Sequence, residues 1–204
     1  MAFPEAFFQS LDQRGWAVSD HAIPAALRDN LRGHALAQWQ AGRFRPAGVG
    51  RGAQAGLHPD IRGDAILWLD EDAADPASKA FFAWTDPLRQ ALNQRYYLGL
   101  RSQEFHFARY EPGHGYARHM DQHRGSRSRL ISLVLYLNRA WDEHDGGELC
   151  LYSPEDHASR LAAISPTAGR VAVFRSDLIP HEVLPAQRVR WSLTGWFRND
   201  EKSI

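Results

Sequence analysis

Two histidines and an aspartate have the residue types and spacing of a metal site. His119 and Asp121 are separated by one residue, and His181 follows sixty residues after Asp121. Two imidazoles and one carboxylate can occupy one face of an octahedral iron(II) ion and leave its other positions open for substrates and oxygen. Arg190, nine residues after His181, adds a guanidinium that can bind a carboxylate through two parallel hydrogen bonds. The set predicts an oxygenase with a carboxylate-bearing cosubstrate.

A second His-x-Asp triplet must be distinguished from this one by its context. His58-Pro59-Asp60 lies in a stretch rich in Gly, Ala and Pro, and Pro59 favours a turn or extended backbone at His58. His119 instead follows a strand-like run, residues 105–110, and a glycine-containing turn, residues 111–115. We therefore predict a loop at His58 and a metal ligand at His119.

The composition indicates one globular domain, residues 1–204, with 44% apolar and 24% charged residues. Lys+Arg and Asp+Glu number 24 each, so no overall field would attract nucleic acid or an anionic membrane. Cys150 is the single cysteine, which excludes an internal disulfide and suits a reducing cytosol. Residues 1–11 lack the pattern of a signal peptide, and no apolar run approaches the roughly 18 residues of a membrane span. We expect a cytoplasmic protein, and the oligomeric state stays open.

Residues 1–100 are expected to form a mainly helical scaffold around these candidates. Apolar residues at helical spacing predict helices over 24–40 and 79–97, the second with a break near Pro87. The stretch between them, 44–64, is rich in glycine and precedes a short strand at 65–69. Because long loops in compact domains are often functional, we expect a substrate loop at 44–64.

Residues 101–198 are expected to form the catalytic β-core, a sandwich or barrel of short strands. The strands carry β-branched or aromatic residues and are separated by Gly, Pro, Asp or Asn; they are predicted at 105–110, 130–138, 148–152, 170–175 and 189–197. Residues two apart in a strand share a face, so Arg190 shares one with Ser192, Thr194 and Trp196. The opposite face is apolar. A buried arginine in this position would need an anion.

Several segments, in order, resemble the iron(II)/2-oxoglutarate dioxygenases of the prolyl 4-hydroxylase type. They are Tyr110-Glu111-Pro112-Gly113, Tyr116-Ala117-Arg118-His119-Met120-Asp121, Tyr136-Leu137-Asn138, Gly146-Gly147-Glu148-Leu149 and Pro180-His181-Glu182-Val183. Upstream, Ile61-Arg62-Gly63-Asp64, followed by Ile66 and Trp68, resembles the substrate-loop segment of the HIF prolyl hydroxylases and their bacterial relatives. The ordered set is more specific than any single motif. It implies an α+β fold with a double-stranded β-helix (jelly-roll) core and supporting N-terminal helices.

The resemblance also implies a role for each matching residue. His119, Asp121 and His181 would bind iron(II), and Arg190 would hold the distal carboxylate of 2-oxoglutarate, so that these four are the catalytic set. Supporting cosubstrate contacts would come from Tyr110, Tyr136, Thr194, Val134, Leu149 and Val183. Substrate contacts would come from Arg62, Asp64, Arg129 and Trp196. O2 is the second cosubstrate, and the resemblance also allows L-ascorbate as a reductant.

The predicted activity is hydroxylation of a prolyl residue in a cytosolic protein, and the resemblance suggests a translation elongation factor as a target. One alternative is hydroxylation of free proline or another small metabolite, although a long loop favours a macromolecular substrate. A catalytically silent metal- or 2-oxoglutarate-binding sensor is a third reading. A nucleic-acid demethylase is disfavoured, because Trp196 stands where such enzymes tend to carry a second arginine.

Overall fold

The structure, a computed structural model, describes residues 3–48, 56, 58, 60–71, 75–122 and 127–200. The helices are α1 (Glu5–Arg14), α2 (Ala25–Gln40), α3 (Pro76–Tyr96) and the short 3-10 helix η2 (Glu143–Asp145). The strands are β1 (Trp16–Ser19), β2 (Arg45–Pro46), β3 (Asp64–Trp68), β4 (Ser102–Tyr110), β5 (Tyr116–His119), β6 (Arg129–Tyr136), β7 (Leu149–Tyr152), β8 (Arg160–Ile164), β9 (Val171–Arg175), β10 (His181–Val183) and β11 (Arg190–Arg198).

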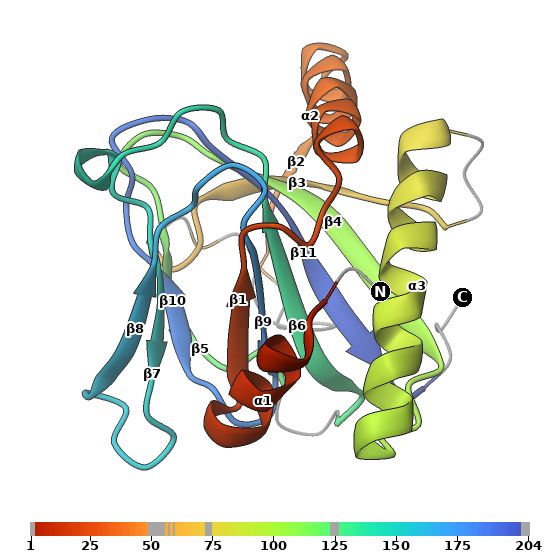
Figure 1. The fold of residues 1–204 in the computed structure, drawn as a ribbon. Coiled ribbons are helices and arrows are strands. Elements are labelled where there is room, and N and C mark those ends of the chain that lie inside the picture. Colours follow the sequence, from red (N-terminus) through yellow and green to blue (C-terminus); the bar gives the residue numbers. More distant parts are fainter. Residues whose placement is uncertain are drawn as a thin grey trace.

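The strands form two antiparallel sheets that face each other (Figure 1). The large sheet has the order β1-β9-β6-β11-β4-β3-β2, and the small sheet has the order β5-β10-β7-β8. The sheets and the N-terminal helices confirm the predicted α+β fold with a double-stranded β-helix core. The chain crosses repeatedly between the sheets, and this brings residues distant in sequence to one end of the sandwich.

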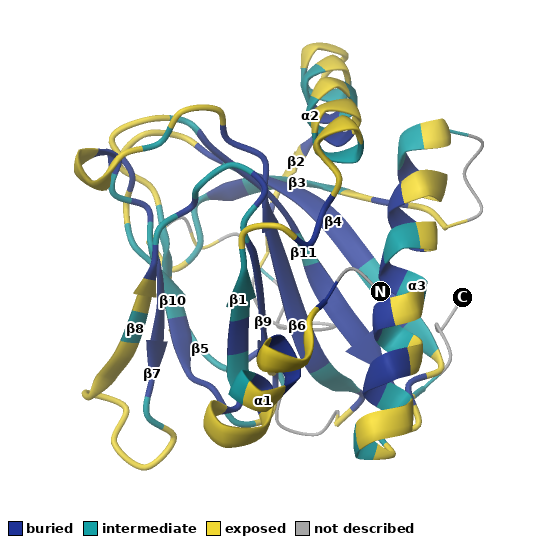
Figure 2. Cartoon of the chain, in the orientation of Figure 1, coloured by how far each residue is buried: buried dark blue, intermediate teal, exposed yellow. Residues whose placement is uncertain are grey.

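Strand alternation divides the buried side chains into two clusters. In β6, Leu133 and Leu135 belong to the cluster packed under the helices, whereas Val134 and Tyr136 face the small sheet. The large sheet is therefore apolar on both faces in its centre, where strands β4, β6, β9 and β11 are buried along most of their length (Figure 2).

The helices cover the outer face of the large sheet. In α3, Phe81 packs edge-on against Phe105 of β4 with 5.0 Å between ring centroids. The Asp75 side chain caps α3 by accepting a hydrogen bond from the Ser78 N–H at 2.9 Å. This layer supports the strands that carry the site from behind.

Helix α3 runs without interruption through Pro87, so the predicted break was wrong. Proline removes one N–H from a helix and strains the turn before it. Here Pro87 and Ala83, four residues earlier, both lie on the exposed side, where water can satisfy the freed carbonyl. Leu88 and Leu92 are buried against the sheet, and their packing outweighs the local penalty.

The N-terminal part of the chain contributes strands as well as helices. Strand β1 pairs with β9 and extends the large sheet at one edge, while β2 and β3 extend it at the other. The predicted substrate loop, 44–64, therefore begins and ends in sheet structure. Residues 49–55, 57 and 59 of that loop lie outside the described residues.

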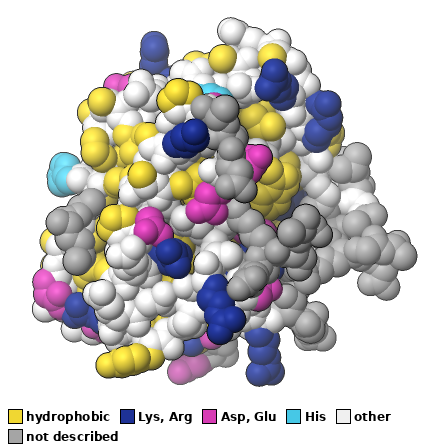
Figure 3. All heavy atoms as spheres, turned by 90° about the vertical axis from the view of Figure 1, so that its right-hand side faces the viewer, with side chains coloured by type: hydrophobic (Ala, Val, Ile, Leu, Met, Phe, Trp, Pro, Cys, Tyr) yellow, Lys and Arg dark blue, Asp and Glu magenta, His cyan; other side chains and the backbone are white. Residues whose placement is uncertain are grey.

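Charged side chains of both signs are interspersed over the face shown in Figure 3. This distribution agrees with the equal numbers of basic and acidic residues. Among the residues that the structure describes, no helix has the length and apolar character needed to cross a membrane.

Candidate active site

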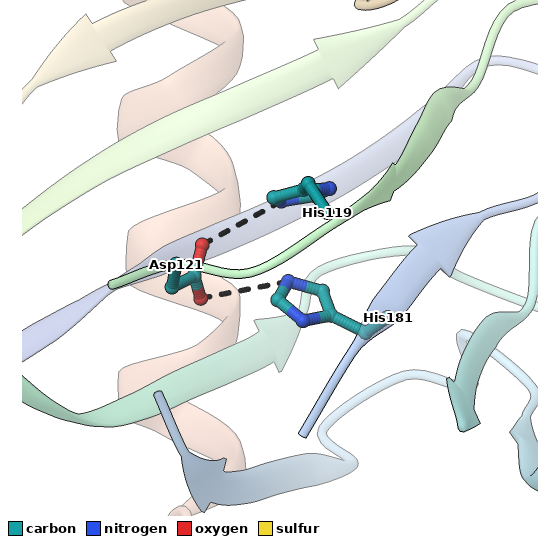
Figure 4. Close-up of side chains that lie close together, drawn as sticks. All are labelled: His119, Asp121 and His181. Carbon is teal, nitrogen blue, oxygen red and sulfur yellow. Dashed lines mark ion pairs between the residues drawn. The ribbon is translucent and has the colours of Figure 1, made fainter. Parts of the chain in front are cut away.

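The side chains of His119, Asp121 and His181 lie close together, with the Asp121 carboxylate directed toward both imidazoles (Figure 4). His119 ends β5 and His181 begins β10, and the two residues are directly paired across these antiparallel strands. Asp121 lies between them, with each of its carboxylate oxygens 3.5 Å from the Nε2 atom of one imidazole. One ligand atom from each residue lies within 4.8 Å of the others. In the described part of the chain this is the one cluster with the make-up of a metal site.

Hydrogen bonds fix both imidazoles with the nitrogen Nε2 free for a metal. His119 Nδ1 lies 2.8 Å from the Ala117 carbonyl oxygen, and His181 Nδ1 lies 3.1 Å from the Ile179 carbonyl oxygen. A carbonyl only accepts, so each Nδ1 carries the hydrogen and each Nε2 keeps its lone pair. The Ser132 hydroxyl donates to Asp121 at 2.6 Å and orients the carboxylate.

The surroundings of Asp121 and His181 hold these two side chains in the protonation states that a metal requires. Burial alone would raise the pKa of Asp121, but the imidazoles of His181 and His119 and the Ser132 hydroxyl together lower it below its usual value. Burial lowers the pKa of His181 to about 4, against the opposing attraction of Asp121. At neutral pH the carboxylate is ionised and the His181 imidazole is neutral, which suits iron(II).

Arg190 provides a buried positive charge in the same cavity. Its side chain is only 1% exposed, and it donates to the Gly147 carbonyl oxygen at 2.9 Å and to the Ser192 hydroxyl at 3.3 Å. Neither acceptor is charged, so the guanidinium retains the capacity to bind an anion. The rings of Tyr110 and Tyr136 flank it, with centroids 5.2 Å and 5.1 Å from its central carbon.

The Tyr136 hydroxyl is a buried polar atom that meets no hydrogen-bond partner among the described residues. Burial raises the pKa of Tyr136 to about 12, so its phenol keeps the proton and can donate. A free donor beside an arginine without a carboxylate fits one end of a dicarboxylate such as 2-oxoglutarate. Three side chains that could hold iron(II) and a guanidinium that could bind an anion thus share one cavity.

This cavity has a volume of about 330 Å³ and contains most of the predicted site residues. The iron ligands and Arg190 lie on its wall with Tyr110, Thr194, Val134, Leu149, Val183, Arg62, Arg129 and Trp196. The two others lie just behind the wall: Tyr136 stacks near Arg190, and Asp64 forms a bidentate ion pair with Arg62 at 2.6 and 2.9 Å. The Thr194 hydroxyl donates to the Leu133 carbonyl oxygen at 3.2 Å.

The two predicted substrate arginines are not freely solvated. The side chains of Arg62 and Arg129 are 13% and 15% exposed, and each is paired with a carboxylate, that of Asp64 and that of Glu104. The Arg129 guanidinium also lies 3.4 Å from the centroid of the Trp196 ring. Both charges are held in place at the cavity wall.

Further side chains contribute to the site without having been assigned a role from the sequence. Ser132 holds Asp121, while Trp68, His106 and Tyr116 line the cavity. Strand periodicity could have identified His106 and Ser132, because they lie two or four residues from predicted site residues on strands β4 and β6. It could not have identified Tyr116, because it places residues three apart, such as Tyr116 and His119, on opposite faces of a strand.

The second His-x-Asp triplet has no part in this cavity. His58 and Asp60 are both exposed, and Pro59 lies outside the described residues. Among the described residues, the candidate metal ligands are therefore His119, Asp121 and His181.

Two histidines and one aspartate on a jelly-roll core define a class of non-haem iron oxygenases. Here they share a cavity with an arginine that pairs with no carboxylate of the described residues. Residues 105–198 match the family described as the 2OG-Fe(II) oxygenase superfamily. Among solved structures, a Pseudomonas putida prolyl-4-hydroxylase is 40% identical, with a TM-score of 0.84 over 96% of this chain and 98% of that one. A Trichoplax adhaerens prolyl hydroxylase, solved with a hypoxia inducible factor peptide fragment, is 27% identical, with a TM-score of 0.83 over 95% and 87% of the two chains.

Curated relatives point to the same group. Egl nine homolog 1 of Rattus norvegicus is 32% identical over 150 residues, which make up 71% of this chain and 44% of that protein. The chain thus spans less than half the length of this relative. The chain belongs to the 2OG-Fe(II) oxygenase superfamily, and within it to the prolyl 4-hydroxylase type.

Proposed function

We propose that the protein catalyses the iron(II)- and 2-oxoglutarate-dependent hydroxylation of a prolyl residue in a protein substrate. The observation that carries this proposal is the shared cavity, in which His119, Asp121 and His181 face the unpaired guanidinium of Arg190. Its relatives in structure and sequence are prolyl hydroxylases. The fold alone would not decide the substrate.

In this proposal the residues of the chain bind and orient iron(II) and 2-oxoglutarate, and they exclude water. The triad would hold iron(II), and Arg190 with Tyr136 would hold 2-oxoglutarate. Val134, Leu149 and Val183 form apolar walls around the cosubstrate position, where they keep water away from the reacting groups. When bound, iron(II) would activate O2, the oxidant, and 2-oxoglutarate would supply two electrons by decarboxylation to succinate, so that one oxygen atom enters a C–H bond of the substrate.

A macromolecular substrate is supported by the rim of the cavity. Trp68 lines the cavity and is 48% exposed, and Ile61, 42% exposed, adjoins the segment that carries Arg62. Large apolar side chains exposed at a site mouth are suited to contact a polypeptide. A translation elongation factor stays a predicted target, resting on the resemblance of the sequence.

The test begins with purified protein, iron(II), 2-oxoglutarate and L-ascorbate. Succinate should form, and Asp121→Ala should abolish both iron binding and succinate formation while the fold is kept, because two imidazoles cannot complete the ligand set. His58→Ala is the matched control and should behave as the unmodified protein. Iron binding and full turnover by Asp121→Ala would refute the site.

The substrate is identified by mass spectrometry of host proteins with and without the active enzyme. A gain of one oxygen on a proline that depends on Asp121 supports the proposal. Efficient oxidation of free proline would instead show a small-metabolite hydroxylase. A failure to form succinate under any condition would indicate a binding protein.

A further inference from the structure

Strand β5, which carries the iron ligand His119, is held on one side by the segment Ile61–Asp64. On its other side it pairs with β10 as the edge strand of the small sheet. Residues Arg62 and Tyr116 form an isolated antiparallel bridge, with Ala117 N–H donating to the Ile61 carbonyl at 2.8 Å and Gly63 N–H donating to the Gly115 carbonyl at 3.0 Å. Asp64, at the end of this segment, begins β3 of the large sheet. The segment therefore joins the two sheets beside the metal site.

A bulge in β5 turns Tyr116 toward the metal ligand. His119 pairs with His181 and Tyr116 pairs with Val183, so three steps along β5 match two steps along β10. An extra residue re-aims the side chains on the bulged strand. As a result, Tyr116 and His119 lie on the same side, and their rings stack with 3.6 Å between centroids and 18° between planes.

The Tyr116 ring also contacts a charged side chain of the Ile61–Asp64 segment. The central carbon of the Arg62 guanidinium lies 4.8 Å from the Tyr116 centroid. Arg62 is itself locked to Asp64, whose side chain is fully buried. Asp64, Arg62, Tyr116 and His119 thus form a continuous series of contacts from the large sheet to the metal ligand.

The Ile61–Asp64 segment and β5 are also tightly packed at two glycines. A Cβ atom at Gly63, within the segment, would lie 2.8 Å from the side chain of His114, two residues before β5, and one at Gly115, directly before β5, would lie 2.3 Å from the Val183 carbonyl oxygen of β10. Glycine permits both close approaches. Together with the two backbone hydrogen bonds, this packing would transmit a displacement of the segment to β5.

We propose that Tyr116 is a positioning residue that couples the Ile61–Asp64 segment to the orientation of the His119 imidazole. The stack restricts rotation of the imidazole while its Nδ1 hydrogen bond fixes the tautomer. A substrate that displaces or orders the segment would thereby alter the metal site before reaching the metal. The coupling to substrate rests on the proposed function, whereas the effect on the metal ligand can be measured without it.

The experiment is titration of the metal-free protein with cobalt(II), whose visible absorption reports the geometry of its ligands. Replacing Tyr116 with leucine should weaken cobalt binding about tenfold and shift the absorption bands, as loss of groups behind a metal ligand does. Tyr116→Phe keeps the ring and should bind within about twofold of the unmodified protein. Tyr97→Leu, at a position 91% exposed, is the matched control and should have no effect.

Cobalt binding by Tyr116→Leu with unchanged affinity and spectrum would overturn the proposal, and so would equal weakening by Tyr116→Phe. If Tyr116→Leu lacks the native circular dichroism spectrum, Tyr116→Met, which fills a similar volume, takes its place with the same expected results. A double-mutant cycle with Asp64→Asn tests the coupling. The two changes should be non-additive in cobalt affinity, and strict additivity would show that the segment acts independently. These outcomes do not depend on whether proline is the substrate.

Discussion

The Arg190 side chain reaches the cavity because a glycine lies beside its stem. Gly147 has a φ of 73°, and a Cβ atom there would lie 3.1 Å from Arg190 Cδ and 2.9 Å from the Ala186 side chain. Its carbonyl oxygen accepts the Nε–H of Arg190. One glycine thus clears space for the guanidinium and directs it, so that the remaining N–H groups can meet an anion.

Replacing Arg190 with lysine should raise the 2-oxoglutarate concentration needed for half-maximal succinate formation by about tenfold or more. Lysine keeps the charge but loses the planar fork, and one hydrogen bond to a charged group is worth about 1.5–3 kcal/mol. Arg188→Lys is the control, because Arg188 is 54% exposed and pairs with Asp145. Steady-state assays at saturating iron make the comparison, and an unaltered requirement in Arg190→Lys would remove Arg190 from the cosubstrate site.

For single residues, strand periodicity predicts some members of the candidate site and misses others for a physical reason. Counting by two from Arg190 puts Ser192, Thr194 and Trp196 on one face of a strand, and all of them line the cavity. The same rule assigns Tyr116 to the wrong face, because the bulge in β5 depends on pairing with β10. The sequence of one strand does not show how that strand pairs with its neighbour, and so it does not show a bulge.

Among the elements, length and apolar character together favoured a correct prediction. The long apolar strands β4, β6 and β11, the shorter apolar strands β3, β7 and β9, and helices α2 and α3 were all expected within a few residues of their bounds. The short strands β1, β2, β5, β8 and β10 and the N-terminal helix α1 were not. A strand of three residues such as β10 has too few positions to show a period, and it is stabilised by its neighbours.

Helix α3 offers a test of how packing overrides local preference. Pro87→Ala should raise the free energy of unfolding by about 2–3 kcal/mol. Alanine is about 3 kcal/mol more favourable than proline inside a helix, and the greater freedom of the unfolded chain offsets up to about 1 kcal/mol of this gain. Pro87 is exposed, so the change should leave the core packing alone.

Urea unfolding followed by circular dichroism gives this free energy. Lys79→Ala, on the exposed side of the same helix, should stay within about 0.5 kcal/mol of the unmodified protein. A loss of stability in Pro87→Ala would mean that the helix is bent around the proline and depends on that bend.

In the molecule as a whole, the main hydrophobic core and the candidate active site lie in different layers. The cluster between helices and large sheet is built from aromatic and aliphatic side chains, with Phe81, Phe105 and Phe197 among its fully buried members. The space between the sheets combines a smaller apolar cluster with the metal ligands. The polar groups of the site are therefore held in a low-dielectric setting that the first layer stabilises.

The burial of two histidines near the site predicts that the stability of the metal-free protein depends on pH. Burial lowers the pKa of His181 to about 4 and lowers that of His106 well below its ordinary value, with the charges of Arg62 and Arg129 adding to the effect on His106. In the unfolded chain both imidazoles titrate near pH 6.5. Below that pH the unfolded state binds more protons than the folded state, so the free energy of unfolding must fall as the solution is acidified.

The loss should begin near pH 6.5 and, for His181 alone, reach about 3 kcal/mol by pH 4, since each pKa unit corresponds to about 1.4 kcal/mol. Urea unfolding of the metal-free protein at a series of pH values measures this slope. His106→Gln removes one of the two groups that stay neutral when buried, so its curve between pH 6.5 and 4 should be shallower than that of the unmodified protein. His58→Ala, at an exposed position, should reproduce the unmodified curve. Stability that stays level across this range would show that the buried imidazoles accept protons in the folded state, and would contradict the neutral His181 imidazole described above.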